Sequence, residues 1–393
     1  MAEIGYSVCS KLIEVMGSKI IKEICDMLIS LRVLPYFVVG KKEQSDDEPK
    51  ALKGLTEIKG SIDIRIYSKY RIVEGMNDTG GAGRSSSFPR LSELVIDNCP
   101  NLKSFSSCPS LTKLNIIKCP SLTSFPPCPS LEELGLKYNN EALQIIVKST
   151  TRSNTAGAGT SQDDDNVKLR KVEIDNLGYL KSLALNCLTH LRITVIDSIK
   201  EELKSDSEEE EIESEVGDEE IELEVVEAFQ KSASSLQWLY IEGINKLKRV
   251  TGRTGLKHFS ALYELTLRYA DNFELSFPQN LRSLDITGSH KMTSFPMGMQ
   301  YLTSLQTLNL HRCYKLKSLP EWISNLSSLQ SLSISYCEAL KSLPEAMQNL
   351  TSLQRLVIRE CLDLIKRCEE PNGKDYHKIQ HIPSKDIELR RRY

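Results

Sequence analysis

The sequence predicts an α/β solenoid with a curved parallel sheet, an irregular convex side and a short N-terminal helix. Two observations lead to this prediction: one sequence template, LxxLxLxxCxxLxx followed by Leu or Phe, recurs, and its spacing is regular. A period of 24 residues separates the copies that begin at Leu305, Leu329 and Leu353, and a period of 20 residues separates those at Leu91, Leu111 and Leu131. Such a period is typical of repeat architectures, in which each unit stacks on its neighbour.

Further copies of the template fill the interval between these two groups. The copy that begins at Leu281 has Ser289 in the Cys position. Weaker copies begin at Leu169, Leu188, Leu236 and Leu262. The total is about eleven copies, and their pattern matches the leucine-rich repeat consensus.

The LxL core of each copy predicts a short strand. Its two apolar residues, such as Leu308 and Leu310, point to the same side and must enter a core. One coil cannot bury them alone, so neighbouring coils stack and their strands form a curved parallel sheet.

The Cys position follows the strand, where this repeat uses Asn or Cys to turn the chain. A ladder of small buried thiols is therefore expected at Cys99, Cys119, Cys313, Cys337 and Cys361. The CPSL segments, which contain Cys108 and Cys128, are interpreted in the same way. On the return path, 20-residue coils leave no room for a long helix. The 24-residue coils contain EWISNLSSL and EAMQNLTSL, which are long enough for a short helical turn.

Breaks in the period divide the chain into segments. Residues 1–27 are expected to form a truncated coiled-coil-type helix, and residues 28–88 are expected to be the start of the repeat region with a polar loop. Leucine-rich repeats are expected at 89–147, 169–199 and 229–366, a flexible insertion at 148–168, an acidic insertion at 200–228, and a C-terminal cap with a basic tail at 367–393. The two insertions are polar or charged and lack the apolar period.

Charge is distributed unevenly along the chain. The formal net charge is -3, but residues 201–227 hold 15 acidic residues and one Lys, which leaves about +11 for the remainder. The remainder has no basic stripe interleaved with aromatic residues, so nucleic acid is not the expected partner. The acidic insertion is interpreted as a solvated loop; the alternatives are a docking surface for a basic partner and phosphorylation at Ser205 and Ser207.

The cellular compartment is expected to be cytoplasmic. Charged residues interrupt the first 27 positions, so a secretory signal is not expected there, and no apolar run is long enough to span a membrane. Eleven Cys is an odd number, which favours reduced thiols.

Motifs for chemistry are weak. The segment TGGAGRSSS at 79–87 lacks the GK pair and the following helix of a phosphate-binding loop. Cys361, Cys368, His377 and His381 resemble a metal site in spacing, but Cys361 belongs to the ladder and the interval from Cys368 to His377 is too short for a zinc finger. No triad-like context is found. Catalytic residues, cofactors and metals are therefore not expected, and the protein is not expected to be an enzyme.

Three segments resemble one known family. They are the repeats from LTSLQTLNLHRC to LVIREC, the ending KRCEEPNGKDYHKIQHIPSKDIE, and the pair LISLRVLPYFVVGKK and LKGLTEIKGSIDIRI. Together they resemble the repeat domain of plant intracellular immune receptors, the coiled-coil class of nucleotide-binding leucine-rich repeat disease resistance proteins. The ending is the most specific of the three.

The first 27 residues place six apolar residues on one helical face: Ile4, Val8, Leu12, Val15, Ile20 and Ile24. This segment resembles the first helix of the coiled-coil domain in that family. In the family, a nucleotide-binding module lies between this helix and the repeats; its motifs are missing here, so nucleotide binding is not expected.

The resemblance implies recognition of a protein in plant innate immunity: a pathogen effector, a guarded host protein or a full-length receptor. An alternative is a truncated product of a nucleotide-dependent receptor ATPase with no independent function, and an extracellular ectodomain is disfavoured. The residues flanking each LxL pair are expected on the concave face, where aromatic and Arg side chains are typical of binding hot spots. The candidate protein-binding residues are Trp238, Tyr240, Arg268, Tyr269, His311, Arg312, Tyr336, Arg355 and Arg359.

Overall fold

The computed structural model describes residues 37–39, 60–66, 91–99, 102, 108–125, 128–140, 143–145, 169–183, 185–194, 225–243, 255–270 and 275–389. The predicted N-terminal helix, the insertion at 148–168, most of the acidic insertion and the basic tail lie outside these residues. The chain divides into two compact units, Met1–Cys187 and Leu188–Tyr393.

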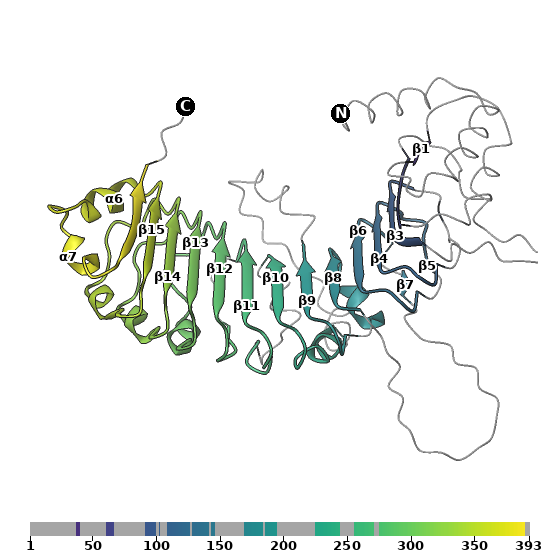
Figure 1. The fold of residues 1–393 in the computed structure, drawn as a ribbon, viewed down its shortest axis with the longest axis horizontal. Coiled ribbons are helices and arrows are strands. Elements are labelled where there is room, and N and C mark those ends of the chain that lie inside the picture. Colours follow the sequence, from purple (N-terminus) through teal and green to yellow (C-terminus); the bar gives the residue numbers. More distant parts are fainter. Residues whose placement is uncertain are drawn as a thin grey trace, which may run out of the picture. The chain divides into compact units, whose positions relative to one another are not determined.

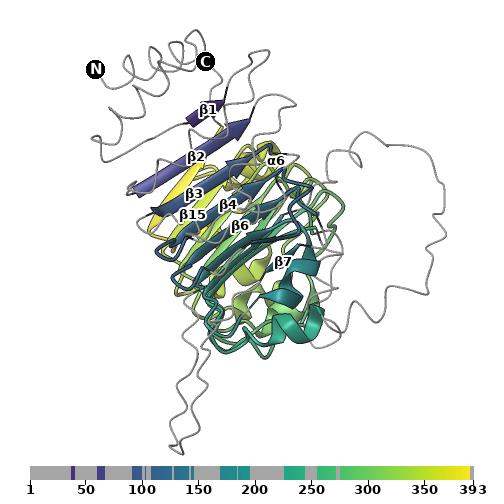
Figure 2. The ribbon, with the colours of Figure 1, turned by 90° about the vertical axis from the view of Figure 1, so that its right-hand side faces the viewer.

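The described part of the first unit contains a parallel sheet with its strands in sequence order. These strands are β1 (Phe37–Val39), β2 (Gly60–Ile66), β3 (Leu91–Asp97), β4 (Lys113–Ile117), β6 (Glu133–Lys137) and β8 (Lys171–Ile174). Figure 2 shows β2, β3, β4 and β6 side by side. On the return path, β5 (Ser124–Phe125) pairs with β7 (Gln144–Ile145), and η2 (Leu177–Ser182) is a 3-10 helix.

The second unit continues the same construction with longer coils. Its parallel strands are β9 (His190–Ile193), β10 (Trp238–Glu242), β11 (Glu264–Arg268), β12 (Ser283–Thr287), β13 (Thr307–His311), β14 (Ser331–Ser335), β15 (Arg355–Arg359) and β16 (Ser384–Glu388). They lie side by side in sequence order (Figure 1). The short helices are η4 (Met297–Tyr301), η5 (Glu321–Asn325), η6 (Glu345–Asn349), α6 (Leu362–Cys368) and α7 (Tyr376–Ile379).

The predicted leucine-rich repeat solenoid is confirmed. Each of the eleven template copies supplies one strand of the large sheet between β3 and β15, where β5 and β7 form a separate pair. The short return-path turns predicted in EWISNLSSL and EAMQNLTSL are η5 and η6. The LxL residues alternate with outward-pointing residues as predicted, and Leu308, Leu332 and Leu356 are fully buried in register with one another. The apolar period therefore determines both the strands and the core that they cover.

The residue immediately after a strand adopts a left-handed backbone conformation in nine coils. The residues are Asn98, Lys118, Tyr138, Tyr269, Arg312, Tyr336, Glu360, Gly243 and Gly288. In this conformation the amide continues the hydrogen-bond ladder: Arg312 N–H donates to the Ser335 carbonyl at 2.9 Å, and Tyr336 N–H donates to the Arg359 carbonyl at 3.0 Å. The strand thus ends sharply without leaving its last amide unpaired, and the seven non-glycine residues accept a local strain.

The predicted cysteine ladder is confirmed. All five ladder residues are buried, as are Cys108 and Cys128. Each ladder thiol lies near the carbonyl oxygen of the last strand residue, as in Cys119, whose Sγ is 3.3 Å from the Ile117 oxygen. Burial raises the pKa of the Cys108 thiol to about 12, so this side chain remains a neutral, unreactive thiol at pH 7.

Replacing Ser289 by Cys is expected to stabilise the protein by about 1 kcal/mol. Ser289 is fully buried in the ladder, and its hydroxyl has no hydrogen-bond partner, so it bears a desolvation cost that a thiol largely avoids. Urea unfolding of the wild type and Ser289→Cys would measure the difference. A lower urea midpoint for Ser289→Cys than for the wild type would show that the larger sulfur atom does not fit between the coils that contain Gly288 and His311.

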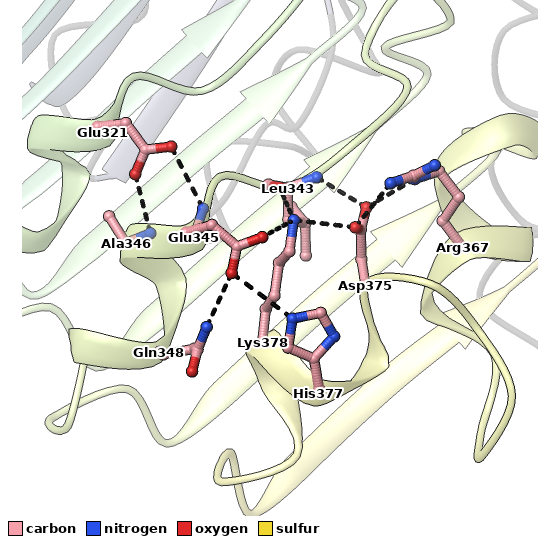
Figure 3. Close-up of polar contacts among 9 residues, drawn as sticks. All are labelled: Glu321, Leu343, Glu345, Ala346, Gln348, Arg367, Asp375, His377 and Lys378. Carbon is pink, nitrogen blue, oxygen red and sulfur yellow. Dashed lines mark hydrogen bonds and ion pairs between the residues drawn. The ribbon is translucent and has the colours of Figure 1, made fainter.

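The C-terminal cap closes the second unit through one buried carboxylate. The Asp375 side chain is fully buried and accepts hydrogen bonds from Arg367 Nε at 2.8 Å, Arg367 Nη2 at 2.9 Å and the Leu343 amide at 3.1 Å. Lys378 Nζ lies 3.0 Å from the same carboxylate and donates to the Leu343 carbonyl at 2.7 Å (Figure 3). The cap is thereby fastened to the last coils, and β16 completes the sheet.

The four residues with metal-like spacing have separate roles in the described cap. Cys361 belongs to the ladder, and Cys368 is buried at the end of α6. His377 Nε2 lies 3.5 Å from the exposed carboxylate of Glu345, whereas His381 Nε2 lies 3.3 Å from the Leu350 carbonyl. The residues thus take part in packing and in separate polar contacts.

Candidate functional site

The structure separates the nine candidate residues into two groups. Six are strand residues: Trp238 and Tyr240 on β10, Arg268 on β11, His311 on β13, and Arg355 and Arg359 on β15. They occupy positions that alternate with the buried LxL residues, so they lie on the sheet face opposite the core, called the open face below. Tyr269, Arg312 and Tyr336 lie one residue beyond their strands, in the left-handed turns at the carboxyl edge of the sheet.

Three strands bring together an aromatic group, the β10 cluster, which consists of His190, Arg192, Trp238, Tyr240 and Glu264. The rings of Trp238 and Tyr240 are stacked with centroids 6.1 Å apart, and the centroid of the His190 ring lies 6.0 Å from that of Trp238. Arg192 covers the Tyr240 ring at 4.4 Å, and Trp238 Nε1 donates to Glu264 Oε1 at 3.1 Å. Tyr240 is consequently only 8% exposed. The cluster is a preorganised surface whose rings are held by their neighbours.

A second aromatic group follows the carboxyl edge of β11 to β13. The Tyr269 ring meets His290 edge-on at 5.9 Å, and His290 lies 5.1 Å from Tyr314, which is 36% exposed. Arg268 lies over the Tyr269 ring at 5.0 Å, and its Nη2 donates to the Tyr269 hydroxyl at 3.2 Å. Ring-to-ring contacts therefore connect three successive coils.

The next pair of coils repeats the arrangement. His311 meets the Tyr336 ring edge-on at 5.2 Å, and the guanidinium of Arg312 lies 5.9 Å from the centre of the same ring. Burial, followed by the positive charge of Arg312, lowers the pKa of His311 below its ordinary value, although Asp285 opposes this. His311 is therefore mainly a neutral ring at pH 7.

The two arginines of β15 differ in their availability. Arg359 forms ion pairs with Asp386 and Glu388 of β16, so its charge is engaged within the chain. Arg355 is exposed. Of the two, Arg355 is the better placed to contact a partner.

The sequence interpretation missed five members of these groups: His190, Arg192, Glu264, His290 and Tyr314. His190 and Arg192 lie on β9 in direct register with Trp238 and Tyr240, but the repeat that begins at Leu188 matches the template weakly. His290 and Tyr314 each follow the ladder position, one at Ser289 and the other at Cys313. Both residues occupy the same position in their repeats, 24 residues apart, and this equivalence is the sequence signal that could have identified them.

The described residues of both groups offer aromatic rings, guanidinium groups and carboxylates for noncovalent contact. No group of three or more His, Cys, Asp or Glu residues in the described part of the chain is arranged to hold a metal ion. The described helices include none that is long and apolar enough to cross a membrane.

The fold and its exposed face define a leucine-rich repeat protein, a class whose members typically act as noncatalytic protein-interaction modules. Residues 206–362 match the profile of the family described as plant disease resistance protein RPS2-like, leucine-rich repeats. The match supports repeats of the plant resistance type, and its residues include Trp238, Tyr240 and Glu264 of the β10 cluster and the aromatic side chains at the carboxyl edge of β11 to β14. No curated protein matches the chain.

Two solved structures are similar in part. The leucine-rich repeat domain of the type III effector XopL has 26% identity over 35% of this chain and 48% of that chain, with a TM-score of 0.27. A complex of TLR13 with the RNA ssRNA13 has 16% identity over 92% of this chain and 54% of that chain, with a TM-score of 0.40. The chain thus spans about half the length of either structure.

Proposed function

We propose that this protein is a recognition module of plant innate immunity that binds a pathogen effector or a host protein on the concave, open face of its repeats. The observation that supports this proposal best is the concentration of Trp, Tyr, His and Arg side chains on β9, β10 and β11 of that face and along its carboxyl edge. These residue types dominate the energetics of protein interfaces, and here neighbouring rings already hold them in place.

The proposal extends to the cellular setting. We propose a cytoplasmic protein in which the repeats bind the partner, while the segment at 1–27 pairs with a helical bundle of another receptor. Such a protein would act as a regulator or decoy and would not switch by nucleotide exchange. The plant resistance-type repeats at 206–362 support this setting.

Replacing Trp238, Arg268 and Arg312 together by Ala is expected to abolish partner binding. The variant removes the centre of the β10 cluster, the guanidinium group of Arg268 on the open face and that of Arg312 at the edge, whereas the LxL core remains. The measurement is co-immunoprecipitation from plant tissue that expresses the tagged full chain, with circular dichroism to verify the fold. The matched control carries Met297→Ala and Tyr301→Ala in η4, where both side chains are more than half exposed on the return side.

The expected result is a protein that co-immunoprecipitates with the wild type and with the η4 variant but not with the triple variant. A partner that binds all three chains equally would contradict the assignment of binding to the open face.

A further inference from the structure

The carboxyl edge of the sheet has an unusual charge in the middle of the second unit. Between Asp285 and Glu321 the sequence contains no Asp or Glu, but it contains four basic residues and two His. Five of them lie in the loops after β12 and β13, and His311 is the last residue of β13; the six are His290, Lys291, His311, Arg312, Lys315 and Lys317. Together with the neighbouring Tyr269, Tyr314 and Tyr336 they form what we call the basic edge.

Backbone hydrogen bonds hold these loops against their neighbours. The Lys317 amide donates to the Thr293 carbonyl at 3.3 Å, and the Ala339 amide donates to the Tyr314 carbonyl at 3.3 Å. The His290 and Tyr314 rings, whose centroids are 5.1 Å apart, also join the coils of β12 and β13 through side chains. The charges therefore lie on a surface that is already ordered, so little conformational entropy is lost in these loops when a partner binds.

Three cations of this edge, Arg312, Lys315 and Lys317, are not neutralised by ion pairs within the described residues. All three side chains are exposed. Cations of the adjoining coils differ: Lys341 lies 3.9 Å from Asp363, and Arg359 pairs with Asp386. Three uncompensated cations on one rigid loop create a positive potential that favours an anionic partner.

The rings of this edge favour a polypeptide over a single-stranded nucleic acid. Bases require free aromatic faces for stacking, but the Tyr269 and Tyr336 rings already carry the guanidinium groups of Arg268 and Arg312. A phosphodiester chain would also pass the carboxylates of Glu242, Glu264 and Asp285 on the adjoining open face. A polypeptide can place its carboxylates only where cations lie.

We propose that the basic edge binds a carboxylate-rich segment of the protein partner. This inference rests on the proposed recognition function and names the chemistry of the partner. Carboxylates of the segment pair with Arg312, Lys315 and Lys317, and its apolar side chains pack on Tyr314 and on the edge of the His290 ring. The open face then supplies the remaining contacts.

The experiment measures binding of a fluorescein-labelled 16-residue peptide, in which Glu alternates with Ser and Leu, to the full chain by fluorescence anisotropy. The same peptide with Gln in place of Glu, and a single-stranded 16-nucleotide uridine RNA, serve as comparison probes. The variant carries Arg312→Glu, Lys315→Glu and Lys317→Glu. Glu is compatible with the left-handed position of Arg312, because Glu360 occupies the equivalent position. The control carries Lys231→Glu, Lys257→Glu and Lys366→Glu, which are exposed outside the basic edge and change the net charge equally.

We expect the Glu peptide to bind the wild type and the control at low salt, at least tenfold more weakly to the edge variant, and more weakly in 0.5 M NaCl. Absence of binding to the wild type, or equal loss in the control and the edge variant, would overturn the proposal. Tighter binding of the RNA than of the peptide would overturn it in favour of nucleic acid. If the peptide fails while the Trp238, Arg268 and Arg312 variant still loses its captured protein, the recognition function stands and only the carboxylate assignment fails.

Discussion

Replacing Asp375 by Asn is expected to lower the free energy of unfolding by about 3 to 5 kcal/mol. The fully buried carboxylate accepts hydrogen bonds from Arg367 and the Leu343 amide and neutralises Lys378, whose side chain is only 8% exposed. An amide of the same size removes the negative charge and directs a donor at these cations. Figure 3 shows Asp375 between Arg367 and Lys378, so the substitution leaves these two cations without the carboxylate that separates them.

Urea unfolding at pH 7 measures the effect of Asp375→Asn. Glu345→Gln is the matched control, since Glu345 contacts the same Lys378 but is 64% exposed, and it should lower stability far less than Asp375→Asn does. Equal losses of stability in Asp375→Asn and Glu345→Gln would show that the buried contacts of Asp375 stabilise the protein no more than the exposed contact of Glu345.

The dependence on pH provides a second check on the same substitution. Burial acts to raise the pKa of Asp375, but hydrogen bonds from Arg367 and the Leu343 amide outweigh it and hold the pKa at about 2, below the ordinary value of 3.8. Because the folded-state pKa is depressed, the stabilisation is complete above the unfolded pKa and is lost as pH falls toward 2. The difference between the wild type and Asp375→Asn should therefore shrink by about 2 kcal/mol between pH 6 and pH 2.

Replacing Gly288 by Val is expected to cost about 2 to 4 kcal/mol, the second largest effect. Gly288 follows β12 with a φ of +70°, a region that β-branched residues rarely adopt. A Cβ atom at this position would lie 2.8 Å from Cε1 of Tyr269, so the ring must move. Displacing that ring also disrupts its contact with His290, and peptide binding at the basic edge should weaken in parallel.

The control for this prediction is Tyr336→Gly, at the equivalent position two coils later, where φ is +56°. Glycine relieves the backbone strain there but loosens the unfolded chain and removes a ring contact, so the net change should stay within about 1 kcal/mol. Both variants are measured by urea unfolding. If Gly288→Val does not lower the free energy of unfolding, the Tyr269 ring can move aside to accommodate the new side chain.

The repeat sequence predicted the architecture in detail because its information is local and periodic. Each LxL pair specifies a strand and a buried side, and the next copy repeats the choice one coil later. For this reason the weak copy at Leu188 still forms β9, and the single departure at Ser289 still lies in the buried ladder. The Cys ladder followed from the same spacing.

The binding surface was predictable only in part, because side chains from different coils determine it. The template predicted Trp238 and Tyr240 on the open face, but it gave no account of Arg192, which covers Tyr240, or of Glu264, which accepts from Trp238. It likewise treated Arg312 and Tyr336 as face residues. In the structure, Arg312 and Tyr336 lie in left-handed turns directly after their strands, so they are at the edge of the sheet. These turns depend on hydrogen bonds to the next coil, which the template does not specify.

The sequence by itself determined the solenoid, the eleven strands of the template copies and the buried side of each, since burial of a periodic apolar pattern has one stacked solution. Tertiary structure alone decided which polar side chains meet. Stacking neighbouring coils brings His290 against Tyr314 across 24 residues and collects Arg312, Lys315 and Lys317 on an edge free of acidic residues. It also buries Asp375 between Arg367 and Lys378. Those contacts depend on distances between coils, which no single repeat encodes.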